Sequence, residues 1–412
     1  MLNMEVKPKL NGFQSEKINP SQIKTADFVI GIPSYCEADN IAFVVERCNE
    51  GLQKYFPDKN AVIINVDNNS PDNTRSAFLN TSSEVPKIYI STPTGVKGKG
   101  NNFYNLFVES SKLGAETIVV VDADLKSITG EWIRDLATPV LENAFDFVTP
   151  LYSRNEYDGT ITNNICYPLL YGLLGKDIRQ PIGGDFAMSA SLVKYFLDQN
   201  WHQTTRQYGI DIFLTLNAIV GDFDICQVGL GAKIHKPSAP KLGPMFTQVV
   251  GTLFTTLLEN REKWYKNKDL SDLPLFGKVE LSKPQSLSVD YKGMKATAIY
   301  EFSINREILS ECLSPSVFNK CEKMYNEGKI TIGIDLWTKI VYDLLEAYER
   351  FGHSPELIEA MKSLYFGRVV SFIKQTLELD HHQSEQQIQN QARHFFKHRS
   401  RLIRKYQGKK VA

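Results

Sequence analysis

TIVVVDAD, residues 117–124, is the stretch of sequence that decides the fold. A short apolar, β-branched run of this kind predicts a strand that is buried on both faces, as in a parallel sheet covered by helices. Residues two apart in a strand share a face, so Asp122 and Asp124 are expected to project together from the end of this strand. Carboxylates that close repel each other unless a cation lies between them, and oxygen ligands suit Mg²⁺ or Mn²⁺. The stretch therefore predicts a divalent metal site.

Similar apolar runs alternate with helical patterns on both sides of this strand. Helices are expected at Ile41–Tyr55 and Asn102–Leu113, where apolar residues recur at helical spacing. Further strands are expected at Phe28–Pro33, Ala61–Val66, Ile88–Ile90 and Phe145–Pro150. This order predicts an α/β domain with a mostly parallel, Rossmann-like sheet, which binds ligands at the carboxyl ends of its strands.

Polar clusters follow the first two predicted strands and precede the second predicted helix. Residues 33–37 and 67–72 carry acidic and amide side chains that can contact a nucleobase edge and ribose hydroxyls, although the same residue types are common in plain turns. Residues 95–100, GVKGKG, allow close backbone approach, and Lys99 could reach a phosphate. The segment does not match a Walker loop, and it could equally be a flexible basic turn.

The second half of the chain has a different pattern. Amphipathic helices are expected at 245–258 and 335–351, a helix start at Ser354-Pro355, and a capping box at Ser384 and Gln387. A boundary is expected near Pro240. The predicted organisation is an N-terminal extension at 1–26, the α/β domain at 27–240 and a mainly helical region at 241–412.

Composition excludes several classes of protein. The 412 residues contain 47 basic and 47 acidic side chains, so neither nucleic acid nor an anionic membrane is expected as a partner. The six cysteines are scattered, which disfavours a zinc site or a disulfide framework. No signal-peptide core and no run of the ~20 apolar residues that span a bilayer is present, so a cytoplasmic location is expected.

Several motifs together resemble one family. They are P-S-Y-x-E (33–37), V-D-N-N-S-P-D (66–72), G-K-G-N (98–101), V-D-A-D (121–124), P-I-G-G-D-F (181–186), Y-G-I-D (208–211) and V-G-L-G-x-K-x-H (228–235). The set resembles GT-A-fold retaining glycosyltransferases that make glucosyl-3-phosphoglycerate, glucosylglycerate or mannosylglycerate. The likeness covers Asp27–Lys236, and residues 364–372 also resemble the tails of that group. It implies transfer of glucose or mannose from a GDP-, UDP- or ADP-sugar to D-glycerate or 3-phosphoglycerate, giving a compatible solute. It is also compatible with a homodimer.

The resemblance implies a role for each matching residue. Metal ligands would be Asp124 and His235, with Asp122 beside them. Catalytic roles would fall to Asp211, Asp185 and Tyr208. The acceptor would contact Gly159, Thr160, Thr162 and Asp211. The nucleotide sugar would contact Pro33, Ser34, Tyr35, Glu37, Asp67, Asn68, Lys99, Asp122, Ala123, Gly183 and Gly184.

Two positions depart from related patterns. Ile210 precedes Asp211 where inverting relatives have an E-D pair, which favours a retaining enzyme without a dedicated base, in which the leaving phosphate accepts the proton. Thr160 stands where phosphoglycerate-using relatives have an arginine, and planar bidentate pairing is why arginine serves there. This difference favours unphosphorylated glycerate, unless Arg154 or Arg179 supplies the charge.

Three alternatives remain open. A transferase acting on a sugar or polysaccharide would predict membrane segments, an E-D base or Q-x-x-R-W, and the sequence contains none of these. A sugar-phosphate nucleotidyltransferase would predict a basic, glycine-rich loop after the first strand, where residues 32–35 read IPSY. A non-catalytic binding module is the third.

Overall fold

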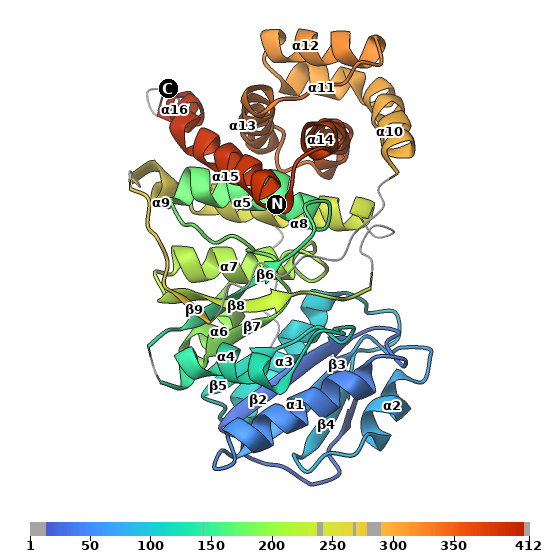
Figure 1. The fold of residues 1–412 in the computed structure, drawn as a ribbon, viewed down its shortest axis with the longest axis vertical. Coiled ribbons are helices and arrows are strands. Elements are labelled where there is room, and N and C mark those ends of the chain that lie inside the picture. The colour runs from blue at the N-terminus through green and yellow to red at the C-terminus, as the bar shows by residue number, and fades with distance from the viewer. Residues whose placement is uncertain (1–13, 143, 237–241, 267–268, 278–289, 408–412) are drawn as a thin grey trace, which may run out of the picture.

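The computed structural model describes residues 14–142, 144–236, 242–266, 269–277 and 290–407. In these residues the chain forms one nine-stranded sheet with helices on both faces and a helical layer beyond its edge (Figure 1). The strand order is β1-β4-β3-β2-β5-β7-β6-β8-β9. Five of the eight neighbouring pairs are parallel, which confirms the predicted mostly parallel sheet.

The predicted strands form most of the sheet. β2 (Phe28–Ser34) lies between β3 (Ala61–Asp67) and β5 (Thr117–Val120), and β4 (Lys87–Ser91) pairs with β3, all in parallel. Ser34, Asp67 and Ser91 are in register, so the polar residues that follow these strands gather at one edge. The short β1 (Glu16–Ile18) runs antiparallel to β4.

The other half of the sheet contains an insertion that the sequence did not indicate. β7 (Phe186–Ser189) runs antiparallel between β5 and β6 (Phe147–Ser153), and β6 pairs in parallel with β8 (Ile225–Ala232). β9 (Leu275–Gly277), from the C-terminal half, extends β8 in parallel. The carboxyl ends of β6 and β8 therefore lie at the same edge of the sheet as the carboxyl ends of β2, β3 and β5.

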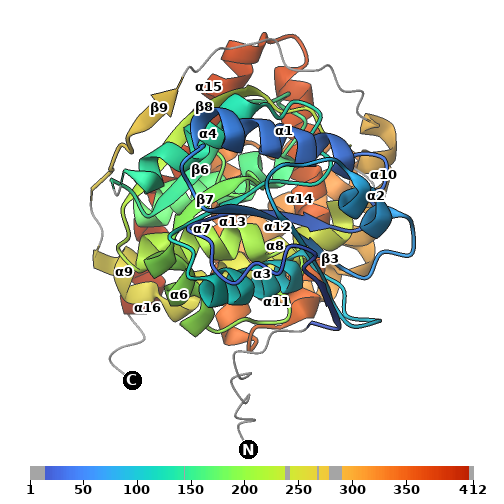
Figure 2. The ribbon, with the colours of Figure 1, turned by 90° about the horizontal axis from the view of Figure 1, so that it is seen from below.

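Helices cover both faces of the sheet (Figure 2). α1 (Ile41–Tyr55) and α4 (Gly130–Leu141) lie on one face; α3 (Lys99–Leu113), α6 (Ala190–Asp198) and α7 (Ile210–Val220) cover the other, and the short α2 (Thr74–Asn80) contacts α1 and β4. Residues of β2 alternate between the two cores: Ile30 packs into the α1/α4 core and Val29 into the α3 core. Burial on both faces explains why this strand is apolar throughout.

The helical layer comes from two separate parts of the chain. Residues 162–174 form the π-helical segments η1 (Thr162–Cys166) and η2 (Leu170–Leu174) around α5 (Tyr167–Leu169), and they pack against α15. The Trp337 indole donates to the Asn164 carbonyl at 2.7 Å, and the Gln391 amide to the Asn163 carbonyl at 2.9 Å. The C-terminal helices are α8 (Leu242–Glu259), α9 (Arg261–Lys266), α10 (Tyr291–Ile304), α11 (Arg306–Cys312), α12 (Pro315–Asn326), α13 (Ile334–Arg350), α14 (Pro355–Thr376), α15 (His381–His398) and α16 (Ser400–Gln407).

Most predictions for this helical region are confirmed, and one is wrong. α8 and α13 contain the two predicted stripes, and the Ser354 hydroxyl accepts from the Leu357 amide at the start of α14. The capping box is not at Ser384 and Gln387: it is formed one turn earlier by Asp380 and Gln383, so Ser384 lies inside α15. An aspartate caps as well as a serine, and the polar first turn hid the true start. The predicted boundary at Pro240 lies outside the described residues.

Among the helices that the structure describes, none combines the length and apolar character needed to cross a bilayer.

Candidate active site

A cavity of about 870 Å³ opens at the carboxyl edge of the sheet, under the helical layer. Its walls come from residues that follow β2, β3, β5, β6 and β8, from the start of α3 and from α8, α10 and α14. Every residue to which the resemblance assigned a role lines it except Asp67 and Asp185. The predicted site residues on the wall are Pro33, Ser34, Tyr35, Glu37, Asn68, Lys99, Asp122, Ala123, Asp124, Gly159, Thr160, Thr162, Gly183, Gly184, Tyr208, Asp211 and His235.

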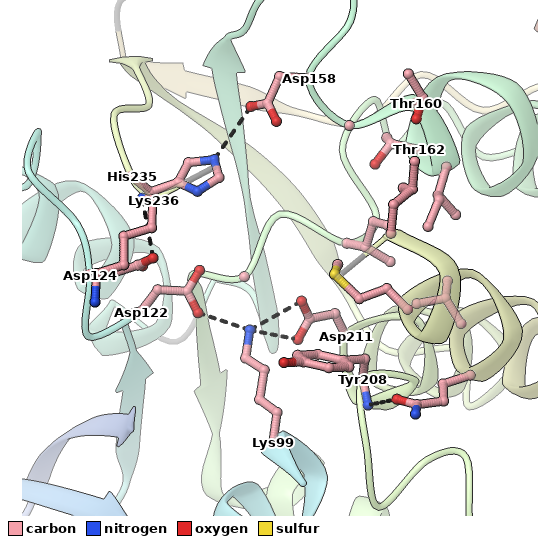
Figure 3. A pocket seen from close by; sticks show the side chains of 18 of the residues that line it. Lys99, Asp122, Asp124, Asp158, Thr160, Thr162, Tyr208, Asp211, His235 and Lys236 are labelled. Carbon is pink, nitrogen blue, oxygen red and sulfur yellow. Dashed lines mark hydrogen bonds and ion pairs between the residues drawn. The ribbon is translucent and has the colours of Figure 1, made fainter. Parts of the chain in front are cut away.

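Five side chains of alternating charge form a row that begins on the floor of the cavity and ends behind it. The Lys99 ammonium lies 3.2 Å from the Asp211 carboxylate and 2.8 Å from Oδ1 of Asp122 (Figure 3). On the other side, Oδ2 of Asp122 lies 3.0 Å from the Lys233 ammonium, which lies 2.8 Å from Asp185. Lys233 also donates to the Gly183 carbonyl at 2.7 Å. The row links the starts of α3 and α7 to the carboxyl ends of β5 and β8 and to the start of β7.

Burial and neighbouring charges set the protonation of this row. Burial alone would lower the pKa of Lys99, but Asp122 and Asp211 outweigh it and hold that pKa above its ordinary value. Burial alone would raise the pKa of Asp122, but Lys99 and Lys233 hold it well below its ordinary range. The pKa of Asp211 is raised by burial and by the nearby charge of Asp122, against the opposing effect of Lys99. The row thus keeps Asp122 ionised and leaves Asp211 the more basic carboxylate.

Asp185 and Asp67 lie behind the wall. Asp185 is fully buried and accepts from the Asp122 backbone amide at 2.8 Å, from Lys233 and from the Tyr152 hydroxyl. Asp67 is fully buried and accepts from the Ser34 hydroxyl at 2.7 Å, as well as from Ser70 and Tyr89. Both carboxylates hold the loops that line the cavity.

The two residues predicted as metal ligands, Asp124 and His235, lie on adjoining segments. β5 ends at Val120, so the strand alternation used for Asp122 and Asp124 does not apply: Asp122 lies in the irregular segment after the strand, and Asp124 lies in the turn that follows. The Lys236 amide donates to Oδ2 of Asp124 at 3.3 Å, which fixes the two segments together (Figure 3). His235 Nε2 lies 3.3 Å from Oδ2 of Asp158 and faces the same cavity.

The side chains of Asp124 and His235 suit a hard divalent ion that a bound substrate also coordinates. Within the described ranges, no group of three or more His, Cys, Asp and Glu side chains is arranged to hold a metal ion. Asp124 faces no cationic side chain in any ion pair of these residues, whereas Asp122 is engaged by two lysines. One carboxylate and one imidazole fit an ion such as Mg²⁺, which keeps water and takes phosphate oxygens to complete its shell.

The wall near β2 and β3 offers groups for an aromatic, hydrogen-bonding ligand. Tyr35 is exposed, and the Lys97 ammonium lies 2.7 Å from its hydroxyl and 4.7 Å from its ring centre. Oδ1 of Asn68 is buried and has no hydrogen-bond partner among the described residues. A buried acceptor without a partner costs free energy unless a ligand satisfies it. Glu37 is paired with Lys236 at 2.6 Å.

The opposite end of the cavity lies around the segment after β6. The Thr160 hydroxyl lies 2.6 Å from the Tyr365 hydroxyl, and Arg154 pairs with Asp158 at 2.6 Å. Arg154 lines the cavity. Arg179 instead forms a bidentate pair with Glu385 at 2.7 and 2.8 Å and is absent from the wall. Of the two arginines that the sequence offered as substitutes at Thr160, only Arg154 reaches the site.

Sequence reasoning missed Lys233 and the helical wall. Lys233 lay within a recognised motif, but a single lysine gives no sign of its burial between two carboxylates. The wall residues from α8, α10 and α14 have the helical spacing of ordinary core residues. The local sequence therefore does not distinguish residues that line the cavity from residues that pack in the core. They are Leu242, Met245, Gln248, Val249, Met294, Thr297, Phe366, Val369 and Ile373.

Comparisons with known proteins found one family model and several solved structures that are similar to this chain. Residues 29–200 match the family model of glycosyl transferase family 2. Glucosyl-3-phosphoglycerate synthase from Mycobacterium tuberculosis, in complex with Mg²⁺ and UDP, is 24% identical with a TM-score of 0.45, over 56% of this chain and 79% of that chain. Its complex with Mn²⁺, UDP-glucose and phosphoglyceric acid is 23% identical with a TM-score of 0.45, over 56% of this chain and 79% of that chain. A crystal structure of a mycobacterial protein is 26% identical with a TM-score of 0.45, over 56% of this chain and 74% of that chain.

Proposed function

We propose, from the match of residues 29–200 to glycosyl transferase family 2, that this protein is a metal-dependent glycosyltransferase that uses a nucleotide-sugar donor. The observation that carries the proposal is the cavity at the carboxyl edge of the parallel strands, where Asp124, His235 and the charged row meet. Open α/β sheets bind nucleotides at this edge.

The donor would lie across the β2, β3 and β5 ends. The nucleobase and ribose of a GDP-, UDP- or ADP-hexose would contact Tyr35 and the partnerless amide oxygen of Asn68. The diphosphate would lie beside Lys99, at the start of α3, where an ammonium and a helix N-terminus both favour an anion. The hexose would lie against Gly183 and Gly184, where Gly184 has a φ of 91° and a Cβ would come within 2.3 Å of Asp122.

Asp124 and His235 would hold the metal. A divalent ion bound there would supply charge neutralisation for the departing diphosphate. Asp122 is held by two lysines, so its proposed part is to fix Lys99 and Lys233, and Asp185 is proposed as a positioning residue behind them.

We propose the retaining stereochemistry that the resemblance implies. The bond between the anomeric carbon and the diphosphate oxygen breaks, the acceptor oxygen bonds to that carbon on the same face, and the acceptor proton passes to the leaving diphosphate. Asp211 and Tyr208, both on the wall, would orient the acceptor hydroxyl. Lys99, paired with Asp211, lies where it would stabilise negative charge on the diphosphate.

For the acceptor, the resemblance favours D-glycerate or 3-phosphoglycerate. Arg154 supports an acidic acceptor because it is the arginine that the structure places on the described wall. Thr160 supplies no charge and is hydrogen-bonded to Tyr365, which favours the unphosphorylated acid. The product would be a glycosylglycerate of the compatible-solute type.

The test is a transfer assay in Mg²⁺ or Mn²⁺. It crosses GDP-glucose, UDP-glucose, ADP-glucose and GDP-mannose with D-glycerate and 3-phosphoglycerate, and measures free nucleoside diphosphate and product. Asp124→Ala should abolish metal-dependent release, while Asp222→Ala, an exposed carboxylate away from the cavity, should not. Release that is unaffected by chelator and by Asp124→Ala would refute the proposed metal role. Pyrophosphate release from a nucleoside triphosphate would instead establish the nucleotidyltransferase alternative.

A further inference from the structure

We infer that the site also takes an amphipathic acceptor, whose reacting hydroxyl lies at Asp211 and whose apolar body fills the end of the cavity under α8, α10 and α14. The inference rests on the proposed function, because it concerns the acceptor of the same transfer. It adds a substrate class to which D-glycerate, having no apolar part, does not belong.

Three C-terminal helices form this end of the cavity with apolar side chains. α8 contributes Met245 and Val249, α10 contributes Met294, and α14 contributes Phe366 and Val369. Both valines and Phe366 are buried in the main core, so these positions are fixed by packing. Met245 and Met294 are half-buried, so their side chains would face water if the acceptor were always a small polar acid, and water-exposed apolar surface is unfavourable.

The helical part of this wall, as far as the structure describes it, is uncharged. Among the described lining residues that belong to α8, α10 and α14, none is charged, and Gln248 and Thr297 are the polar side chains. Asp290, which caps α10, lies at the start of that helix. The cations of the wall lie at the sheet edge and face carboxylates or the Tyr35 hydroxyl: Lys97, Lys99, Arg154, Lys233 and Lys236.

The apolar wall adjoins the reacting groups. α8 packs on α7, which begins at Ile210 and carries Asp211 in its first turn. The Gln248 side chain accepts from the Tyr208 backbone amide at 3.0 Å, which joins the wall to the loop before α7. A hydroxyl placed at Asp211 would therefore extend its substituent toward Met245 and Val249. The volume of about 870 Å³ is near the upper end for ligand pockets, which suits a donor and such an acceptor together.

The experiment compares acceptors that differ only in an apolar group. Glycerol, 1-O-butylglycerol and D-glycerate are offered with each nucleotide sugar, and kcat/KM is measured from nucleoside diphosphate release and product formation. We expect 1-O-butylglycerol to exceed glycerol in kcat/KM by at least about tenfold, because each buried methylene contributes to affinity.

Two substitutions on one helix locate the effect. Thr297→Asp places a charge on an exposed residue of the wall and should cut the butyl preference to about threefold or less. Tyr300→Asp, one turn further along α10 and 66% exposed, lies outside the wall and should leave the preference unchanged. Neither site is in the core, so both variants should keep the thermal midpoint of the parent.

The outcomes separate this inference from the proposed function. Metal-dependent donor cleavage together with equal kcat/KM for glycerol and its butyl ether would overturn the inference alone. A butyl preference that Thr297→Asp leaves intact would overturn the assigned wall. Absence of metal-dependent donor cleavage with every acceptor would overturn the proposed function and the inference with it.

Discussion

Replacement of Lys233 by methionine would leave two carboxylates facing each other without the ammonium that lies between them. Lys233 has 3% of its side chain exposed, and it contacts Asp122 at 3.0 Å and Asp185 at 2.8 Å. Methionine has a similar length and no charge, so it fills the space without the three hydrogen bonds. The change therefore isolates the contribution of the charge.

The unfolding free energy that Lys233→Met removes depends on the partners that Asp122 and Asp185 keep in the variant. Removing one member of a buried ion pair typically costs about 3–5 kcal/mol, because an uncompensated charge is left buried. Asp122 keeps Lys99, and Asp185 keeps the Tyr152 hydroxyl and the Asp122 amide. We therefore expect the lower end, about 3 kcal/mol of unfolding free energy.

Urea unfolding at pH 7, extrapolated linearly to water, measures this cost. Lys236→Met is the matched control: that lysine is 43% exposed, and its pair with Glu37 should contribute at most about 1 kcal/mol. The pKa of Lys233 is raised, because Asp185 and Asp122 outweigh burial, so its contribution is present below pH 10.5 and lost as the pH rises beyond it. The difference between parent and variant should therefore narrow in alkali.

A double substitution tests the reasoning itself. Asp185→Asn keeps an oxygen for the Asp122 amide and removes the stranded charge, so Lys233→Met/Asp185→Asn should be more stable than Lys233→Met alone. A cost below about 1 kcal/mol for Lys233→Met, or a double variant less stable than the single one, would refute the buried-charge argument.

Three further predictions concern the same cavity. Asp122→Asn should remove stability that the parent has at neutral pH. The pKa of Asp122 is lowered by the two lysines against burial, so the difference should persist above pH 3.8 and shrink as the pH falls below it, measured by urea unfolding. Gly184→Ala should destabilise by about 1–3 kcal/mol and reduce turnover, because φ is 91° and the Cβ would meet Asp122 at 2.3 Å. A chelator should weaken nucleoside diphosphate binding in calorimetry, and Asp124→Ala should remove that sensitivity.

Each of these has a control and a contradicting result. Gly114→Ala also has a positive φ, 74°, but its Cβ would meet nothing within 4 Å, so it should cost less than Gly184→Ala. Equal losses of unfolding free energy in the two alanine variants would show that backbone strain, and not the contact with Asp122, destabilises Gly184→Ala. A constant difference between Asp122→Asn and the parent down to pH 2 would contradict the assigned charge. Metal-independent nucleotide binding would contradict the proposed metal ligands.

The strands could be predicted because their physical cause is local. β2, β3 and β5 are buried on both faces, so almost every position had to be apolar, and the polar residues at their ends marked the cavity edge. The same reasoning could not find β7, whose Phe186–Ser189 run is short and follows a site loop. It also could not place residues 162–174 in the helical layer, since that depends on contacts with helices more than 150 residues away.

The sequence was sufficient to predict which residues gather at the site, but it did not show which of them face the cavity and which lie behind it. Asp67 and Asp185 belong to the recognised motifs, yet both face inward, and which side of a loop a carboxylate takes depends on distant partners such as Tyr89 and Tyr152. Lys233 acquires its importance from Asp122 and Asp185, which are 111 and 48 residues away along the chain. No local spacing encodes such a contact.

The contacts of residues 162–174 with α13 and α15 have a consequence for biosynthesis. This apolar segment leaves the ribosome about 220 residues before α15 is complete, which at bacterial or eukaryotic synthesis rates is roughly 10–45 s. During that interval the nascent chain can assemble its sheet, while Tyr167, Leu170 and Leu173 lack the helices that later bury them. Those side chains are where a chaperone would bind the growing polypeptide, and a chain that stops before α13 would keep them exposed.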